Sequence, residues 1–138
     1  MFTVDHNEKI LVVENHPDVA RVFAFMLESR GYRPTVAASI AEAKKRLGDE
    51  PFDLLVSDYR LDDGDALDLM RWVRSAGFGV MSICVSGYGE DAAAQCKEAG
   101  FDGFLTKPVE LDALEAKVAR LRKERGASAD GGRSNRGE

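Results

Sequence analysis

Three short, uniformly apolar runs constrain the fold more than any other feature of this sequence. They occupy residues 10–13, 54–56 and 83–85. Each run is too short for a helix, and none alternates with polar residues as a half-exposed strand does. Such runs are typical of strands that are buried on both faces of a parallel sheet. Two weaker candidates, residues 34–37 and 103–106, complete a predicted set of five strands.

Amphipathic helical patterns separate the predicted strands. After each strand, apolar residues recur at the spacing of one helix face. The five stripes comprise Val19, Val22, Phe23, Met26 and Leu27; Ile40, Ala43 and Leu47; Ala66, Leu69, Met70 and Val73; Ala92, Cys96 and Ala99; and Leu111, Leu114, Val118 and Leu121. Strict alternation of strand and helix predicts an α/β fold in which helices cover both faces of a parallel sheet.

Helix boundaries are marked by residues with known preferences for these positions. Ser39 and Glu42 have the spacing of a capping box and are expected to open the second helix. Gly31, Gly77 and Gly100 follow the first, third and fourth stripes, so we expect them to end those helices.

Length and charge predict one acidic domain. A chain of 138 residues suits a single domain. Its formal net charge is −5, which disfavours direct binding to nucleic acid or to anionic membranes. The first residues lack the basic and apolar regions of a signal peptide, and no apolar stretch is long enough to insert in a membrane. The expected location is therefore the cytoplasm.

The composition changes near the C-terminus. Residues 125–138 contain no large apolar side chain and are rich in Gly, Ser, Ala, Asp and Arg. Without apolar burial, little offsets the entropy lost on ordering such a segment. We therefore expect an ordered domain at residues 8–124 and a flexible polar tail or linker at residues 125–138.

Polar side chains follow four of the predicted strands and should meet at one edge of the sheet. Glu14, Asp58, Ser86 and Lys107 come after the first, third, fourth and fifth strands. Ligands of open α/β sheets bind beyond the carboxyl ends of the strands. Carboxylate oxygens suit a hard cation such as Mg²⁺, while a hydroxyl and a lysine can hold phosphoryl oxygens. The set therefore favours phosphoryl transfer.

Each of these residues taken alone also has an ordinary structural interpretation. Asp58 fits a turn or a helix cap, the Ser86–Gly87 pair fits a turn, and Glu14 or Lys107 could simply face water. A P-loop is excluded because GxxxxGK[ST] is absent. A flavin-phosphate site is disfavoured because the loop after the first strand carries acidic residues that would repel a phosphate.

Four segments in order, ILVVENHPD, LLVSDYRLDDGDALDLM, ICVSGYG and FDGFLTKPVE, resemble the receiver domains of bacterial response regulators and hybrid histidine kinases. The resemblance covers about residues 8–124. It implies a flavodoxin-like (βα)5 fold, doubly wound, with a five-stranded parallel sheet in the order 2-1-3-4-5. It also implies a phosphoprotein of a two-component system that acts in a phosphorelay and turns over no separate substrate.

The resemblance further implies a role for each matching residue. Asp58 would be the phosphoacceptor, with Ser86 and Lys107 holding the phosphoryl group. The implied Mg²⁺ ligands are Glu14, Asn15, Asp58 and the backbone carbonyl of Arg60. Ser86 and Phe104 would act as the switch, although Phe104 also fits a plain edge-strand aromatic. The Lys107–Pro108 peptide bond is expected to be cis.

The implied partners are proteins. A histidine kinase or a histidine phosphotransfer protein would supply the phosphoryl group, and a downstream protein target would bind the switched surface of the fourth helix, fifth strand and fifth helix. A homodimer through the fourth and fifth helices is a further implied assembly. An aspartate-nucleophile phosphohydrolase is disfavoured because Arg60 stands where that class has a second Asp.

The sequence departs from the family pattern at three positions, and one of them suggests an alternative function. Asn15 stands where the family usually has Asp, Asp62 where proline is common, and Ala66 where glycine is usual. Asn15 removes one negative charge from the implied metal site, and an amide oxygen is a weaker ligand than a carboxylate. The alternative is therefore a pseudo-receiver, a protein-interaction module that phosphorylation does not control.

Overall fold

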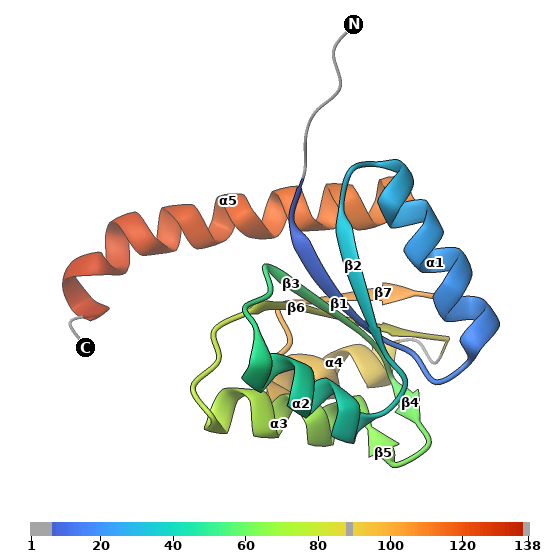
Figure 1. The fold of residues 1–138 in the computed structure, drawn as a ribbon. Helices are drawn as coiled ribbons and strands as arrows, with labels where there is room; N and C mark the ends of the chain where they lie inside the picture. The colour runs from blue at the N-terminus through green and yellow to red at the C-terminus, as the bar shows by residue number, and fades with distance from the viewer. Residues whose placement is uncertain (1–6, 88–89, 137–138) are drawn as a thin grey trace, which may run out of the picture. The chain divides into compact units, whose positions relative to one another are not determined.

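The computed structural model describes residues 7–87 and 90–136 (Figure 1). The elements, in chain order, are β1 (Lys9–Val13), α1 (Pro17–Ser29), β2 (Arg33–Ala37), α2 (Ile40–Asp49), β3 (Leu54–Asp58), β4 (Arg60–Leu61), β5 (Gly64–Asp65), α3 (Ala66–Ser75), β6 (Met81–Ser86), α4 (Glu90–Ala99), β7 (Gly103–Thr106) and α5 (Leu111–Arg136). The chain divides into a unit that ends at Pro108 and a unit that begins at Val109 and contains α5.

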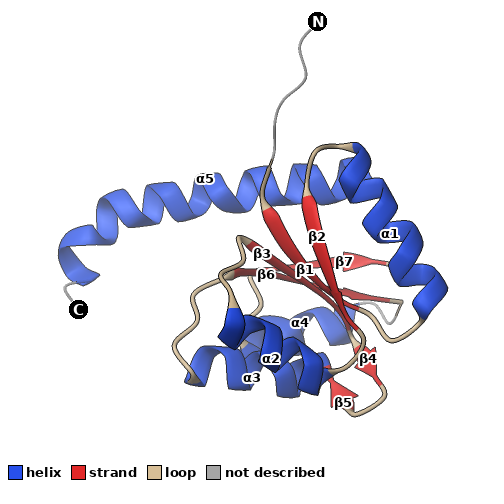
Figure 2. Ribbon diagram, viewed as in Figure 1, coloured by secondary structure: helices blue, strands red, loops and turns tan. Residues whose placement is uncertain are grey.

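Five parallel strands form the main sheet of the first unit (Figure 2). Their spatial order is β2-β1-β3-β6-β7, and every neighbouring pair is parallel. Counted among the parallel strands alone, this is the predicted order 2-1-3-4-5. The flavodoxin-like α/β fold is therefore confirmed. The pairing of Asp58 with Val85 places the carboxyl end of β3 beside that of β6.

The three central strands are buried, as the apolar runs predict, whereas the edge strands β2 and β7 are mostly half-buried. All residues of β3 and β6 are buried. Side chains alternate between the faces of a strand, so Leu11 and Val13 of β1 point into the cluster formed with α2, α3 and α4. Leu55, Leu69, Met70 and Val73 lie in the same cluster with no exposed surface. Each such side chain contributes about 1.5–3 kcal/mol through burial.

The buried face of α1 differs from the predicted one. Ala20 and Leu27 are buried, whereas Val19 and Val22 are 50% and 59% exposed. The stripe that begins at Val19 is therefore wrong in its first two members. The physical reason lies in the composition of residues 19–27, of which all but Arg21 are apolar. Helical spacing cannot select one face when nearly every position is apolar.

The predicted helix boundaries are observed. The Ser39 side chain accepts a hydrogen bond from the backbone N–H of Glu42 at 3.1 Å, which is the first half of a capping box. The Glu42 carboxylate, however, accepts from the backbone N–H of Ala38 rather than from that of Ser39. Gly31, Gly77 and Gly100 follow α1, α3 and α4 with positive φ angles, a conformation that favours glycine.

Helix α5 is longer than the apolar pattern predicts. It runs from Leu111 to Arg136 and so includes most of the segment that composition predicts to be a tail. Backbone hydrogen bonds within a helix need no apolar side chain, so composition alone does not place the end of this helix. The flexibility of residues 125–138 and the boundary at residue 124 stay predictions. In the part of the chain that the structure describes, no helix could cross a membrane.

Candidate functional site

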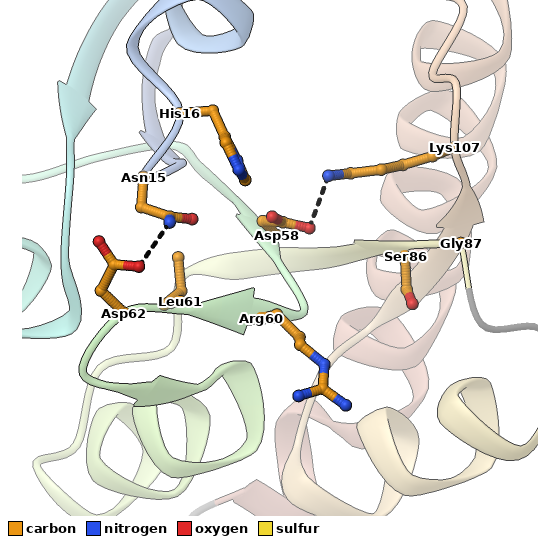
Figure 3. Close-up of a pocket in the computed structure, with 9 residues that line it drawn as sticks. All are labelled: Asn15, His16, Asp58, Arg60, Leu61, Asp62, Ser86, Gly87 and Lys107. Carbon is orange, nitrogen blue, oxygen red and sulfur yellow. Dashed lines mark hydrogen bonds and ion pairs between the residues drawn. The ribbon is translucent and has the colours of Figure 1, made fainter.

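A pocket of about 490 Å³ lies at the carboxyl ends of the parallel strands (Figure 3). Its lining residues come from the loop after β1, the end of β3 and the hairpin beyond it, the end of β6, and the residue after β7. They are Asn15, His16, Asp58, Arg60, Leu61, Asp62, Ser86, Gly87 and Lys107. The pocket thus brings together residues more than 90 positions apart in the sequence, at the edge of the sheet where the sequence predicts a site.

Asp58 is buried at the end of β3, with 8% of its surface exposed. Its Oδ1 atom lies 2.9 Å from Nζ of Lys107 and accepts a hydrogen bond of 2.9 Å from the backbone N–H of Tyr59. Burial raises the pKa of Asp58 above its usual value, and the nearby Glu14 carboxylate adds to this rise, although the bond from Lys107 opposes it. The carboxylate is therefore fixed in place by two donors.

Lys107 connects Asp58 to Glu14. Its Nζ atom lies 2.9 Å from Asp58 and 3.7 Å from Oε1 of Glu14. Burial alone would lower the pKa of Lys107, but the bond to Asp58 and the charges of Asp58 and Glu14 outweigh burial and raise it. Lys107 therefore carries a positive charge at neutral pH. The backbone N–H of Lys107 donates to the carbonyl of Ser86 at 2.9 Å, and the Lys107–Pro108 peptide bond is cis.

Glu14 and His16 follow β1 and lie close to Asp58, and His16 lines the pocket. Glu14 is 6% exposed, and its Oε2 atom accepts from the backbone N–H of His16 at 3.0 Å and lies 2.9 Å from Nδ1 of the same residue. Ligand atoms of Glu14, His16 and Asp58 all lie within 4.8 Å of one another. Sequence reasoning did not single out His16. Its position two residues after Glu14, in the loop where ligands bind, is the signal that could have found it.

The two polar atoms of the Asn15 side-chain amide differ in their hydrogen bonding. Its Nδ2 group donates a hydrogen bond of 2.9 Å to Oδ1 of Asp62, as Figure 3 shows. Its Oδ1 atom is buried and lacks a hydrogen-bond partner among the described residues. A buried polar atom without a partner is costly, so this oxygen is available to a ligand that enters the pocket.

The remaining predicted residues lie around this centre in different ways. Arg60 of β4 lines the pocket with an exposed side chain that points away from Asp58 in Figure 3. Ser86 is 1% exposed, and its hydroxyl is turned away from Asp58 and Lys107 in the same view. Phe104 of β7 does not line the pocket; it is half-buried and packs against the core cluster.

A short antiparallel hairpin follows β3 and contributes Arg60, Leu61 and Asp62 to the pocket lining. It pairs β4 with β5, and its tip is held by Asp63, whose carboxylate accepts from the backbone N–H groups of Ile40 and Ala41 at 2.9 and 3.1 Å. The bond from Ile40, at the start of α2, lowers the pKa of Asp63. Sequence reasoning missed this hairpin because two-residue strands show no periodicity.

The donor set of the pocket fits a divalent cation. It includes the buried carboxylates of Glu14 and Asp58 and the unpartnered amide oxygen of Asn15. Carboxylate and carbonyl oxygens are the ligands that Mg²⁺ prefers. The ammonium group of Lys107 faces both carboxylates. A divalent ion would offset the remaining repulsion between them.

Comparison with known proteins agrees with the fold. Residues 10–119 match the response regulator receiver domain family. The chain belongs to this family, which defines it as a signalling domain of the two-component class.

Two relatives show how such domains occur in longer proteins. The chain is 34% identical over 124 residues to the response regulator protein PilR of Pseudomonas aeruginosa, covering 89% of this chain and 28% of PilR. It is 35% identical over 133 residues to the sensor histidine kinase RcsC of Salmonella typhi, covering 89% of this chain and 14% of RcsC. The chain therefore spans well under a third of the length of these relatives.

Solved structures give the same family. The receiver domain of Francisella response regulator 1452 has a TM-score of 0.79 and 26% identity, and the match covers 86% of this chain and 99% of that one. A CheY-like receiver domain protein from Methanospirillum hungatei has a TM-score of 0.77 and 26% identity, covering 87% and 98%.

Proposed function

We propose that this domain accepts a phosphoryl group on Asp58 with the help of Mg²⁺, from a phosphohistidine on a histidine kinase or a histidine phosphotransfer protein. The observation that carries the proposal is the contact of 2.9 Å between Asp58 and Lys107 at the mouth of the sheet. A buried carboxylate beside a fixed ammonium group is suited to receive an anion and to hold it afterwards.

The contacts of Asp58 favour Oδ2 as the nucleophile. Both Lys107 and the N–H of Tyr59 engage Oδ1, while no hydrogen bond from the described residues reaches Oδ2. In the proposed step, a carboxylate oxygen forms a bond to phosphorus as the bond from phosphorus to the donor's imidazole nitrogen breaks. The electron pair of that bond returns to the imidazole. A bound Mg²⁺ would neutralise charge on the transferring group.

We propose that phosphorylation of Asp58 changes the conformation of residues on β6, β7 and α4. Ser86 ends β6 directly after Val85, which pairs with Asp58, so we propose that its hydroxyl turns toward a phosphoryl group on Asp58. Phe104 lies on β7, paired with Cys84 of β6. On the other side, the Tyr59 hydroxyl donates a hydrogen bond of 2.9 Å to Gln95 of α4. We propose that these residues change the surface that a downstream protein target binds.

The test is phosphorylation of the purified protein by a small acyl phosphate. With Mg²⁺ present, we expect intact-mass measurement to show the addition of one phosphate, and none in Asp58→Asn. Asp49→Asn is the matched control, because Asp49 is an exposed carboxylate on α2 that pairs with Lys45 away from the pocket. No adduct at millimolar Mg²⁺, from either the acyl phosphate or a phosphorylated histidine kinase, would contradict the proposal.

A pseudo-receiver is the second candidate, and one observation favours it. The amide of Asn15 is bonded to Asp62, so the residue that replaces the usual carboxylate already has a structural contact. In that case the domain would bind its partner regardless of phosphate. The same assay separates the two functions, because a pseudo-receiver would show no Mg²⁺-dependent adduct on Asp58.

A further inference from the structure

The candidate cation site of this chain has a histidine beside its two carboxylates. Among the side chains that the structure describes, one group of His, Cys, Asp and Glu is placed to hold a metal ion, and it consists of Glu14, His16 and Asp58. Glu14 and Asp58 are buried and fixed, whereas the side chain of His16 is 66% exposed. The imidazole is therefore the movable member of the group.

The spacing of these atoms is close to what coordination requires. Ligand atoms of the three residues lie within 4.8 Å of one another. Ligands on opposite sides of a transition-metal ion are about 4 Å apart, since each bond is roughly 2.0–2.2 Å long. A small rotation of the exposed imidazole would therefore complete the geometry. The present contact between Nδ1 of His16 and Glu14, at 2.9 Å, already directs the ring into the pocket, as Figure 3 shows.

The chemistry of this set departs from what Mg²⁺ prefers. Mg²⁺ favours an all-oxygen octahedron with anionic ligands. Here Asn15 supplies an amide oxygen in place of a carboxylate, and Lys107 adds a positive charge 2.9 Å from Asp58. Both features weaken the site for any divalent ion, so neither of them selects one metal over another. Imidazole nitrogen, in contrast, suits Zn²⁺ and other first-row transition metals.

We propose that His16 is a ligand of the cation site and gives it a preference for transition-metal ions, with Zn²⁺ and Mn²⁺ as the probes, over Mg²⁺. This inference rests on the proposed function, because it concerns the cation that the phosphoacceptor site binds. The competing interpretation is structural: His16 only holds the Glu14 carboxylate in place. A structural role would change the affinities for all divalent ions alike.

The experiment compares the dissociation constants for Zn²⁺ and Mg²⁺ by calorimetry, without a phosphodonor. The variants are wild type, His16→Ala and His6→Ala. His16 makes no side-chain cap of α1, so its replacement should leave the fold intact, which circular dichroism checks. We expect the preference for Zn²⁺ over Mg²⁺ to fall at least about tenfold in His16→Ala. His6→Ala, which removes the other histidine of the chain, should change it less than about twofold.

Pulsed electron paramagnetic resonance of bound Mn²⁺ supplies a readout that a structural role would not move. We expect modulation from a directly bound ¹⁴N nucleus in wild type and in His6→Ala, and its loss in His16→Ala. An unchanged Zn²⁺ preference, or wild-type Mn²⁺ spectra without nitrogen coupling, would overturn the role of His16.

Asp58→Asn and Glu14→Gln separate this failure from failure of the proposed function. If these two variants lose metal binding while His16→Ala keeps the wild-type preference, His16 is not a ligand and the proposed function stands. If metal binding is the same in all variants, no cation is held by Glu14 and Asp58. That result would overturn both the inference and the metal-assisted function.

Discussion

The centre and the rim of the pocket differ in burial and in their likeness to the family pattern. The centre consists of Glu14, Asp58 and Lys107, whose two carboxylates are almost fully buried and share one ammonium group. The rim consists of Asn15, His16, Asp62 and Asp63, which lie in loops and are half-buried or exposed. The centre follows the receiver pattern, whereas Asn15 and Asp62 of the rim depart from it.

This difference indicates a division of labour. Strand ends fix the centre, because β3 is buried on both faces and cannot shift without disrupting the core. The rim is held by hydrogen bonds at half-buried or exposed positions, such as the bond from Asn15 to Asp62 and the two bonds from the start of α2 to Asp63. We therefore expect changes in the centre to remove function, and changes in the rim to tune affinity or stability.

The largest effect is expected from the centre, in Glu14→Gln. Removing a carboxylate charge beside a divalent ion weakens their Coulomb attraction, so we expect the dissociation constant for Mg²⁺ to rise about 100-fold, which corresponds to about 2.8 kcal/mol. Calorimetric titration measures it. Glu28→Gln, an exposed residue of α1, is the matched control and should titrate as wild type does. If Glu14→Gln titrates normally, Glu14 is not a ligand of the cation.

A smaller, opposite effect is expected at the rim, in Asn15→Asp. The new carboxylate would restore a negative charge beside the carboxylates of the centre, so we expect Mg²⁺ to bind about tenfold more tightly. The control is Asn7→Asp, which adds the same charge at an exposed position near the start of β1. Because Asn15 donates to Asp62 at 2.9 Å, the variant should also be slightly less stable without metal. Weaker or unchanged Mg²⁺ binding would exclude residue 15 as a ligand.

The same contrast explains what the sequence could predict. The strands and the centre were predictable because apolar runs mark buried strands, and the residues that end them, Asp58 and Lys107, must meet at one edge. The buried face of α1 could not be predicted, because nearly every residue from 19 to 27 is apolar and helical spacing therefore selects no single face. His16 was missed because a single histidine two residues after a glutamate is a weak signal for a metal ligand on its own. Its nearness to Asp58 arises only when β1 and β3 pair.

The supporting contacts of the rim were beyond sequence reasoning for a related reason. Asp63 caps a helix that begins 23 residues earlier in the chain. A capping residue is recognised by its place just before a helix, and Ser39 already occupies that place for α2. Asp63 thus adds a second, non-local acceptor, which only the folded hairpin brings to the start of α2.

The smallest effect is expected for Asp63→Ala, which tests the rim through stability. Loss of a helix-capping carboxylate costs about 1 kcal/mol. The folded state lowers the pKa of Asp63, so the stabilisation is complete above the unfolded-state pKa and is lost as the pH falls through the folded-state pKa. We therefore expect urea unfolding at neutral pH to show wild type as more stable by this amount, with the difference shrinking in acid. Asp49→Ala, on the exposed surface of α2, should lose less stability than Asp63→Ala does. A difference that stays constant with pH would mean that the Asp63 charge does not stabilise α2, and that the backbone of the hairpin alone positions the rim.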